Sequence, residues 1–118
     1  MAVDDPLTAV KVNEIIDAVN GIDISWVNFS GGGSPVVNGL AGDITGVTRV
    51  SAGLYRVTFP ARPSANYVVI ANCGKISGRT NGFVTINALA TTYAELYFRS
   101  SEGDANDPII ATVFLIGG

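Results

Sequence analysis

The stretch Gly53–Ala71 (GLYRVTFPARPSANYVVIA) constrains the fold of this chain most, because it has the pattern of two strands joined at a proline-marked corner. Apolar and polar side chains alternate over Tyr55–Phe59, as in a strand with one buried face. Pro60 and Pro63 lack the N–H that a ladder needs, so they interrupt the pairing. The run Tyr67–Ala71 is apolar on both faces, and we expect it to lie between two covering layers. This stretch predicts the core of a β-rich domain.

Further strand patterns recur after Val47 at intervals of about a dozen residues, with Gly, Ser and Asn in the turns between them. The segment Pro35–Gly46 is glycine-rich, and we interpret it as a long loop or a short irregular strand. Short strands at regular spacing are typical of an antiparallel sandwich or barrel. We therefore expect a mostly β fold, an antiparallel β-sandwich over residues 22–118. The expected strands are Ile22–Phe29, Val47–Val50, Leu54–Phe59, Tyr67–Cys73, Gly82–Leu89, Ala94–Arg99 and Ile109–Ile116.

Only Asp4–Gly21 has a convincing helical pattern, and it sets residues 1–21 apart as an N-terminal helix for oligomerisation or anchoring. Asp4 and Pro6 suit its first turn, and Gly21 provides a left-handed stop. Its β-branched seam favours a bundle of three or more helices over two. A single helix docked on its own β-domain, a short parallel bundle with symmetry mates, and disorder remain as alternatives. The seam residues are Val12, Ile15, Val19 and Ile22.

Several classes of function are disfavoured by composition. The net charge of −3 gives no basic footprint for nucleic acid. The absence of histidine removes Ser–His–Asp triads and most zinc sites, and the single Cys73 allows no intrachain disulfide. We expect that cysteine to be a buried small hydrophobe. No apolar run approaches the ~20 residues of a membrane span, and no secretion signal is visible. We expect a soluble protein that is not an enzyme, with no cofactor, metal or membrane insertion.

The low charge content indicates self-association. Charged residues make up 14% of the chain, against about 25% in ordinary soluble domains. A small domain of this kind often hides apolar surface against a partner or against its own copies. The last strand, IIATVFLI, is apolar on both faces, so we expect its outer face to meet another subunit. Phe114 and Ile116 are therefore expected, with the helix seam, at the oligomer interface.

Two polar loops are candidates for contact with a receptor. Ser101–Pro108 (SEGDANDP) concentrates oxygen-bearing side chains and is either a solvated hairpin tip or, less in keeping with its ligand spacing, a calcium loop. Lys75–Asn81 (KISGRTN) is either a plain solvated loop or a contact for surface glycans. Tyr93 and Tyr97 are aromatic groups for sugar stacking or, more commonly, for packing across strands. The candidate contact residues are Lys75, Arg79, Thr80, Asn81, Asp104, Asn106 and Asp107.

Three segments taken together resemble a β-domain of bacteriophage tail-fibre and other virion appendage proteins. They are SWVNFSGGG (Ser25–Gly33), ITGVTRVSAGLYRVTFPARPSANYVVIANC (Ile44–Cys73) and GFVTI (Gly82–Ile86). The similarity covers about half of the chain directly, and most matching positions are strand or turn residues, which define a fold better than an activity. The sequence departs from the family pattern at Leu54, where aspartate is usual, and in a shortened corner at Ala61–Pro63.

The resemblance implies a homotrimeric virion protein, a small tail fibre or fibre tip in host-surface attachment. It further implies that the N-terminal helix forms a trimeric stem or contacts other virion proteins, and that a host surface glycan is a possible ligand. A capsid decoration or head-fibre protein is the alternative within the virion. A free carbohydrate-binding module is a third class, disfavoured by the missing secretion signal.

Overall fold

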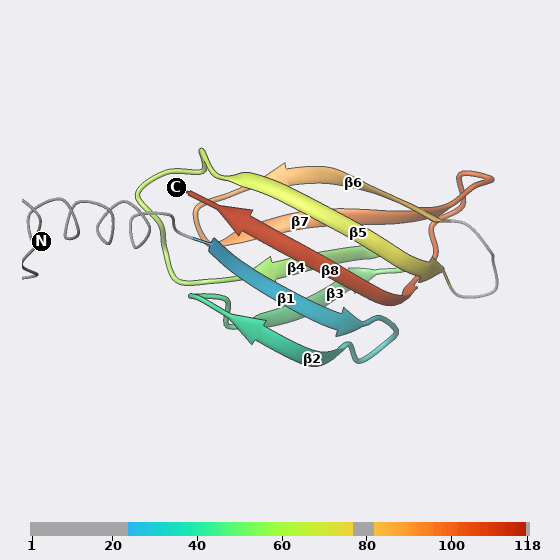
Figure 1. Cartoon of the computed structure of the whole chain (residues 1–118). Helices are drawn as coiled ribbons and strands as arrows, with labels where there is room; N and C mark the ends of the chain where they lie inside the picture. Colours follow the sequence, from blue (N-terminus) through green and yellow to red (C-terminus); the bar gives the residue numbers. More distant parts are fainter. Residues whose placement is uncertain (1–23, 77–81, 118) are drawn as a thin grey trace, which may run out of the picture.

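The computed structural model describes residues 24–76 and 82–117, which form two four-stranded antiparallel sheets packed face to face (Figure 1). The expected mostly β, sandwich-like fold is therefore confirmed. The helix expected at 4–21 and its seam residues Val12, Ile15, Val19 and Ile22 lie outside the described residues. The strands are β1 (Ile24–Ser30), β2 (Val36–Ala41), β3 (Gly46–Ser51), β4 (Leu54–Thr58), β5 (Val68–Ile76), β6 (Gly82–Leu89), β7 (Tyr93–Ser100) and β8 (Pro108–Ile116).

Each sheet combines strands that are not consecutive in the chain. Sheet A has the strand order β2–β1–β8–β5 and sheet B the order β3–β4–β7–β6, so the chain crosses between sheets after β2, β4, β5 and β7. The first and last strands pair directly, with Ile24 opposite Ile116. Residue 24 and the C-terminal strand end therefore lie at one end of the sandwich, here called the base. The opposite end, here called the tip, carries the loops 31–35, 52–53 and 101–107 (Figure 1).

Alternating side chains of both sheets fill the core. In β4, Tyr55 and Val57 are fully buried while the intervening Arg56 is not, as the period-2 pattern predicts. Three aromatic rings, those of Phe29, Tyr55 and Phe98, form a cluster with centroids 5.5–6.1 Å apart, joining both sheets through edge and tilted contacts. The remaining core side chains include Val27, Phe59, Tyr67, Ile76, Leu96, Val113 and Leu115.

The stretch Gly53–Ala71 has the expected form, with the strand β4 before the proline-marked corner and the strand β5 after it. A tight turn precedes it. Gly53 closes the turn between β3 and β4 with a φ of +73°, a left-handed conformation that favours glycine. A Cβ at this position would also collide with the carbonyl oxygen of Phe98. After β4 the chain passes to the other sheet, and Arg62 rather than a proline is the buried residue of the corner, at 8% exposure.

The glycine-rich segment, expected as a long loop or a short irregular strand, contains the strand β2, whose pairing with β1 has one irregularity between Asn28 and Phe29. One expectation is contradicted. Within a single chain, the prediction that Tyr67–Ala71 is covered on both faces is wrong, because Val68 and Ile70 are 57% and 54% exposed. Period-2 patterning shows that both faces are apolar, but it does not show which face the same chain covers.

Candidate functional site

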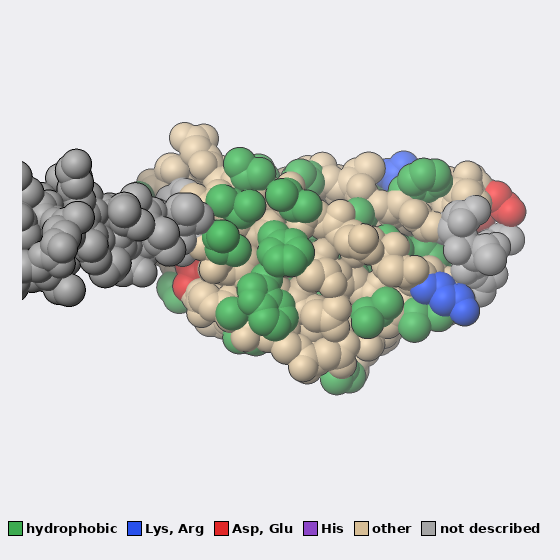
Figure 2. Space-filling view, viewed as in Figure 1, with side chains coloured by type: hydrophobic (Ala, Val, Ile, Leu, Met, Phe, Trp, Pro, Cys, Tyr) green, Lys and Arg blue, Asp and Glu red, His purple; other side chains and the backbone are tan. Residues whose placement is uncertain are grey.

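One surface of sheet A is apolar and uncovered, and we call it the apolar face. Cross-strand pairing places its side chains in two rows next to the base. Ile116 lies between Ile24 and Val68 in the first row, and Phe114 lies between Trp26 and Ile70 in the second. Figure 2 shows these strands from outside, with apolar side chains gathered over β1, β8 and β5 near the base. The apolar face is defined as Ile24, Trp26, Val68, Ile70, Phe114 and Ile116.

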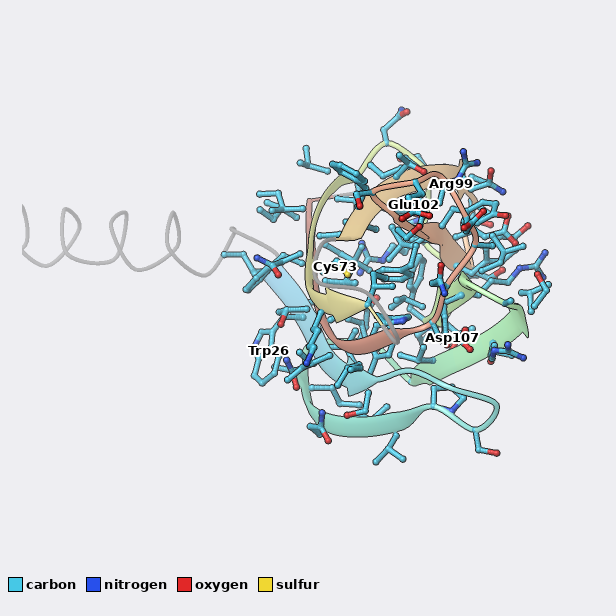
Figure 3. All side chains as sticks on the ribbon, turned by 90° about the vertical axis from the view of Figure 1, so that its right-hand side faces the viewer. Trp26, Cys73, Arg99, Glu102 and Asp107 are labelled. Carbon is cyan, nitrogen blue, oxygen red and sulfur yellow. The ribbon has the colours of Figure 1, made fainter. Side chains whose placement is uncertain are left out.

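Exposure of this face is high for side chains of this kind. Ile24 is 48% and Phe114 37% exposed, and none of the outward positions in the two rows carries a charge. Trp26 is half-buried and projects from β1 on the side of the molecule away from Arg99 and Glu102 (Figure 3). Contiguous apolar surface of this kind in a soluble domain marks an interaction site more often than isolated exposed residues do. Phe114 and Ile116, expected at an oligomer interface, both belong to it.

A polar row limits the apolar face on the side of the tip. Asn28 donates from Nδ2 to Thr112 Oγ1 at 2.8 Å, and Asn38 donates from Nδ2 to Asn28 Oδ1 at 3.0 Å. Asn72 lies opposite Thr112 in the next strand and extends the same row. The amide and hydroxyl groups therefore separate the apolar rows from the tip.

The outer surface of sheet B is of a different kind. Arg56 Nε lies 3.0 Å from Glu95 Oε1, and Asn87 Nδ2 donates to Glu95 Oε2 at 2.7 Å. The hydrogen bond from Asn87, and then that from Arg56, lower the pKa of Glu95. The guanidinium groups of Arg56 and Arg99 lie 4.2 and 4.3 Å from the ring centroids of Tyr93 and Tyr97. This sheet thus presents charged and hydrogen-bonded groups to solvent.

The tip gathers several of the residues expected to contact a receptor. Ile76 at the end of β5 lies opposite Pro108 at the start of β8, which brings Lys75 and the 101–107 loop to the same end. Lys75 and Asp104 are exposed. Arg79, Thr80 and Asn81 lie outside the described residues. The structure therefore places the described members of both candidate loops at one end, opposite the base.

Asp107 is the residue that fixes this tip. Its carboxylate accepts hydrogen bonds from Arg49 Nε at 3.0 Å and Nη2 at 3.1 Å, from the Gly53 N–H at 3.0 Å and from Tyr55 Oη at 2.7 Å. Burial alone would raise the pKa of Asp107, but the hydrogen bonds from Arg49, Gly53 and Tyr55 outweigh it, and the pKa is lowered. Burial raises the pKa of Tyr55 to about 12. Asp107 therefore serves the fold of the tip.

The neighbouring loop residues are held through their backbone. The Ser100 N–H donates to the Asp104 carbonyl at 2.8 Å, and the Asn106 N–H donates to the Phe98 carbonyl at 3.2 Å. Within the described residues the buried Asn106 Oδ1 has no hydrogen-bond partner. No group of three or more His, Cys, Asp or Glu side chains in the described chain is placed to hold a metal ion. The calcium alternative for this loop gains no support from this arrangement.

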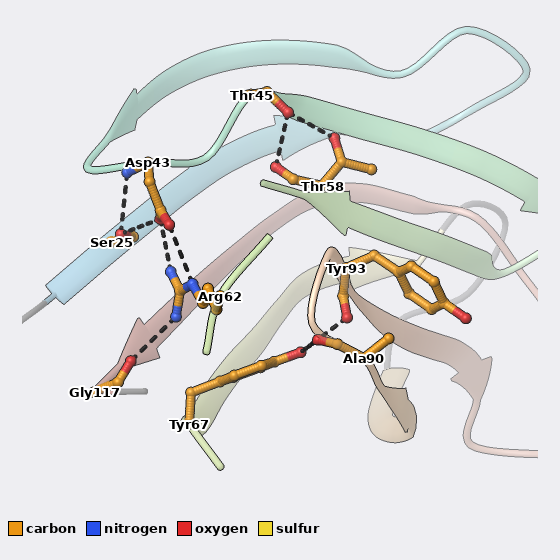
Figure 4. Close-up of polar contacts among 9 residues, drawn as sticks. All are labelled: Ser25, Asp43, Thr45, Thr58, Arg62, Tyr67, Ala90, Tyr93 and Gly117. Carbon is orange, nitrogen blue, oxygen red and sulfur yellow. Dashed lines mark hydrogen bonds and ion pairs between the residues drawn. The ribbon is translucent and has the colours of Figure 1, made fainter. Parts of the chain in front are cut away.

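At the base, Arg62 joins segments that sequence reasoning did not connect (Figure 4). Its Nη2 and Nε donate to Asp43 Oδ1 and Oδ2 at 2.6 and 3.1 Å, and its Nη1 donates to the Gly117 carbonyl at 3.1 Å. Ser25 Oγ donates to Asp43 Oδ1 at 2.9 Å. The hydrogen bond from Arg62 is the main cause that lowers the pKa of Asp43. The position of Arg62 between two prolines gave no sign of this role.

The structure also bears on the expected burial of Cys73. Cys73 is half-buried on β5, and burial raises the pKa of its thiol. Across 24–76 and 82–117 we find no helix long and apolar enough to cross a membrane.

We found no protein-family model, no curated protein and no solved structure that matches this chain.

Proposed function

We propose that this protein is a structural subunit of a bacteriophage virion, a small tail fibre or fibre tip whose copies associate as a homotrimer. The apolar face carries the proposal. A small domain with an uncharged apolar surface on one sheet and an ion-paired surface on the other is suited to a subunit that buries the apolar sheet against a partner and keeps the ion-paired sheet in solvent. The resemblance of residues 25–33, 44–73 and 82–86 to virion appendage domains supports the same assignment.

The two ends of the sandwich have different roles in this proposal. Residues 1–23 join the domain at the base, next to the apolar face. Their expected helix forms a stem with its symmetry mates, contacts other virion proteins, or does both. The tip points away from this attachment and carries Lys75 and the 101–107 loop. The tip is therefore the end that meets the host surface.

Attachment requires no covalent chemistry in this proposal. Lys75 and the exposed polar groups near Asp104 offer charge and hydrogen bonds to a surface glycan. A trimer presents three such tips, and simultaneous contacts combine by avidity, so a weak single contact still retains a particle on a cell. Asp107 is excluded from this contact set because its carboxylate is committed to Arg49, Gly53 and Tyr55.

The decisive experiment is localisation on purified particles of the phage that encodes this chain. Antibody-gold labelling, with antibody pre-absorbed on the purified protein as the control, should mark the tail or baseplate fibres. Label over the capsid lattice would replace the fibre assignment with a capsid decoration or head-fibre protein. Particles without label, when the antibody detects the protein in the infected lysate, would reject the virion role and favour a free carbohydrate-binding module.

A further inference from the structure

A second apolar surface lies at the open side of the sandwich, and we call it the β6 rim. Ile86 and Leu89 pair with Leu96 and Ala94 of β7, whose side chains are fully buried between the sheets. Ile86 and Leu89 point to that same inner side but are 49% and 38% exposed. Because β6 is the edge strand of sheet B, the inner side of these two residues is left uncovered.

The β6 rim and the apolar face lie on either side of β5. This strand forms one edge of sheet A and packs across the sandwich against β6. Val68 and Ile70 of β5 point outward in the apolar face, whereas Ile86 and Leu89 of the β6 rim point toward the interior of the sandwich. The two surfaces adjoin, but they face different directions.

We infer that the β6 rim of one chain packs on the apolar face of the next, so that the subunits form a closed ring by a heterologous contact. This inference rests on the homotrimer of the proposed function and names the surfaces that hold it together. A face-to-face pair related by a two-fold axis would bury the apolar face but leave the β6 rim in water. A head-to-tail contact buries the β6 rim of one chain against the apolar face of the next. Repetition of this contact about a rotation axis closes a ring in which every β6 rim and every apolar face is buried.

Other features of the chain fit a ring of three. Neither surface contains a charged side chain, so their contact buries no unpaired ion. A ring places every base at the same end, so Ile24, to which residues 1–23 are joined, lies at that end in each subunit. The β-branched seam expected in that segment favours three or more helices.

Trp26 provides a direct probe, because it is the only tryptophan of the chain and belongs to the apolar face. We would measure acrylamide quenching of its fluorescence, together with the mass of the full chain by analytical ultracentrifugation, over a range of concentrations. The wild-type protein should sediment at three times its 12.2 kDa chain mass, with a shielded Trp26 that becomes accessible on dilution.

The sharpest variant is Ile86→Lys, which alters the β6 rim and leaves the apolar face intact. In a heterologous ring it should dissociate the trimer and increase quenching of Trp26, which lies on the other surface. Phe83→Lys is the matched control, since Phe83 is 58% exposed on the same strand but pairs with Arg99 on the outer side of sheet B. It should leave both mass and quenching unchanged. Because the N-terminal segment could hold the copies together after the ring opens, quenching is decisive where the mass is unaltered.

Mixing two variants separates the two kinds of symmetry. Ile70→Asp places a charge in the apolar face of one chain, and Ile86→Lys places a charge in the β6 rim of the other, so each variant has one disrupted surface. In a heterologous contact, each mixed pair retains one intact junction, so the mixture should form a heterodimer that cannot close into a ring. A two-fold contact would instead leave Ile86→Lys fully assembled and with shielded Trp26. That result, or a monomeric wild type at high micromolar concentration, would overturn the inference.

These outcomes differ from failure of the proposed function. If the ring assembles as described but the protein is absent from virions, the inferred interface stands and the fibre assignment is rejected. If the protein is found on virions but is monomeric or forms a two-fold dimer, the fibre assignment stands and the ring is rejected.

Discussion

Tyr55 donates a 2.7 Å hydrogen bond from its hydroxyl to Asp107 Oδ1, and the same hydroxyl accepts the Gly32 N–H at 2.8 Å. Tyr55 is fully buried, and its ring packs on Phe29 and Phe98. A core side chain thus reaches two loops at the tip and holds them in place. The contact surface that we propose at the tip is positioned from within the core.

Removal of this hydroxyl should loosen the tip. We expect Tyr55→Phe to lower the free energy of unfolding by about 1–2 kcal/mol, because Asp107 and the Gly32 N–H each lose a partner. Urea denaturation followed by fluorescence would measure the change. Tyr97→Phe is the matched control, since the Tyr97 hydroxyl makes no hydrogen bond within the described residues, and it should alter stability by less than about 0.5 kcal/mol. Equal losses for the two variants would show that the hydroxyl contacts contribute nothing specific.

Stability should fall in acid because Asp43, Glu95 and Asp107 all have lowered pKa values in the fold. A carboxyl whose folded pKa is depressed binds protons more readily when unfolded, so its contribution is present above the unfolded pKa and is lost as pH falls through the folded value. The free energy of unfolding should therefore be level above about pH 5 and decline below about pH 4. Urea midpoints across this range, compared with those of Asp107→Asn, would test it. A wild-type curve that stays flat in acid would contradict the prediction.

The arginine at the base should tolerate no conservative replacement. Lysine has no planar fork, so Arg62→Lys cannot donate to Asp43 and the Gly117 carbonyl in the observed geometry. We expect a loss of about 1–3 kcal/mol in the free energy of unfolding, since the Arg62 side chain is only 5% exposed. Arg56→Lys is the control, because the Arg56 side chain is 41% exposed, and it should cost less than about 1 kcal/mol. Similar losses at the two positions would argue against a special role for the buried arginine.

The N-terminal seam supplies a prediction that is independent of the β-domain. Replacement of Ile15 and Val19 by Asp should weaken the trimer, since charges would meet at the seam of the expected bundle. Sedimentation at decreasing concentration would show dissociation earlier than in the wild type. Asn13→Asp, on the outward side of the same pattern, should have no effect. An unchanged dissociation profile for the double variant would favour a helix docked on its own β-domain.

The candidate site was predictable only where it follows from alternation. Phe114 and Ile116 were expected at an interface because the last strand is apolar on both sides, and they do lie on an uncovered face. Asp107 was expected as a loop-tip residue, but it is anchored by Arg49, which lies 58 positions earlier in the chain. The β6 rim had no sequence signal, because Ile86 and Leu89 resemble ordinary core residues of a strand.

The sequence by itself determined where most of the strands and turns lie, since side-chain alternation, Gly53 and the prolines act through local backbone geometry. Only the tertiary structure decided that β1 pairs with β8 and β4 with β7, and with this which apolar side faces the core. An apolar strand can be paired and buried in several ways that its own residues do not distinguish. The choice depends on contacts between segments distant in the chain, and these contacts also create the Asp107 and Arg62 networks and leave the apolar face open.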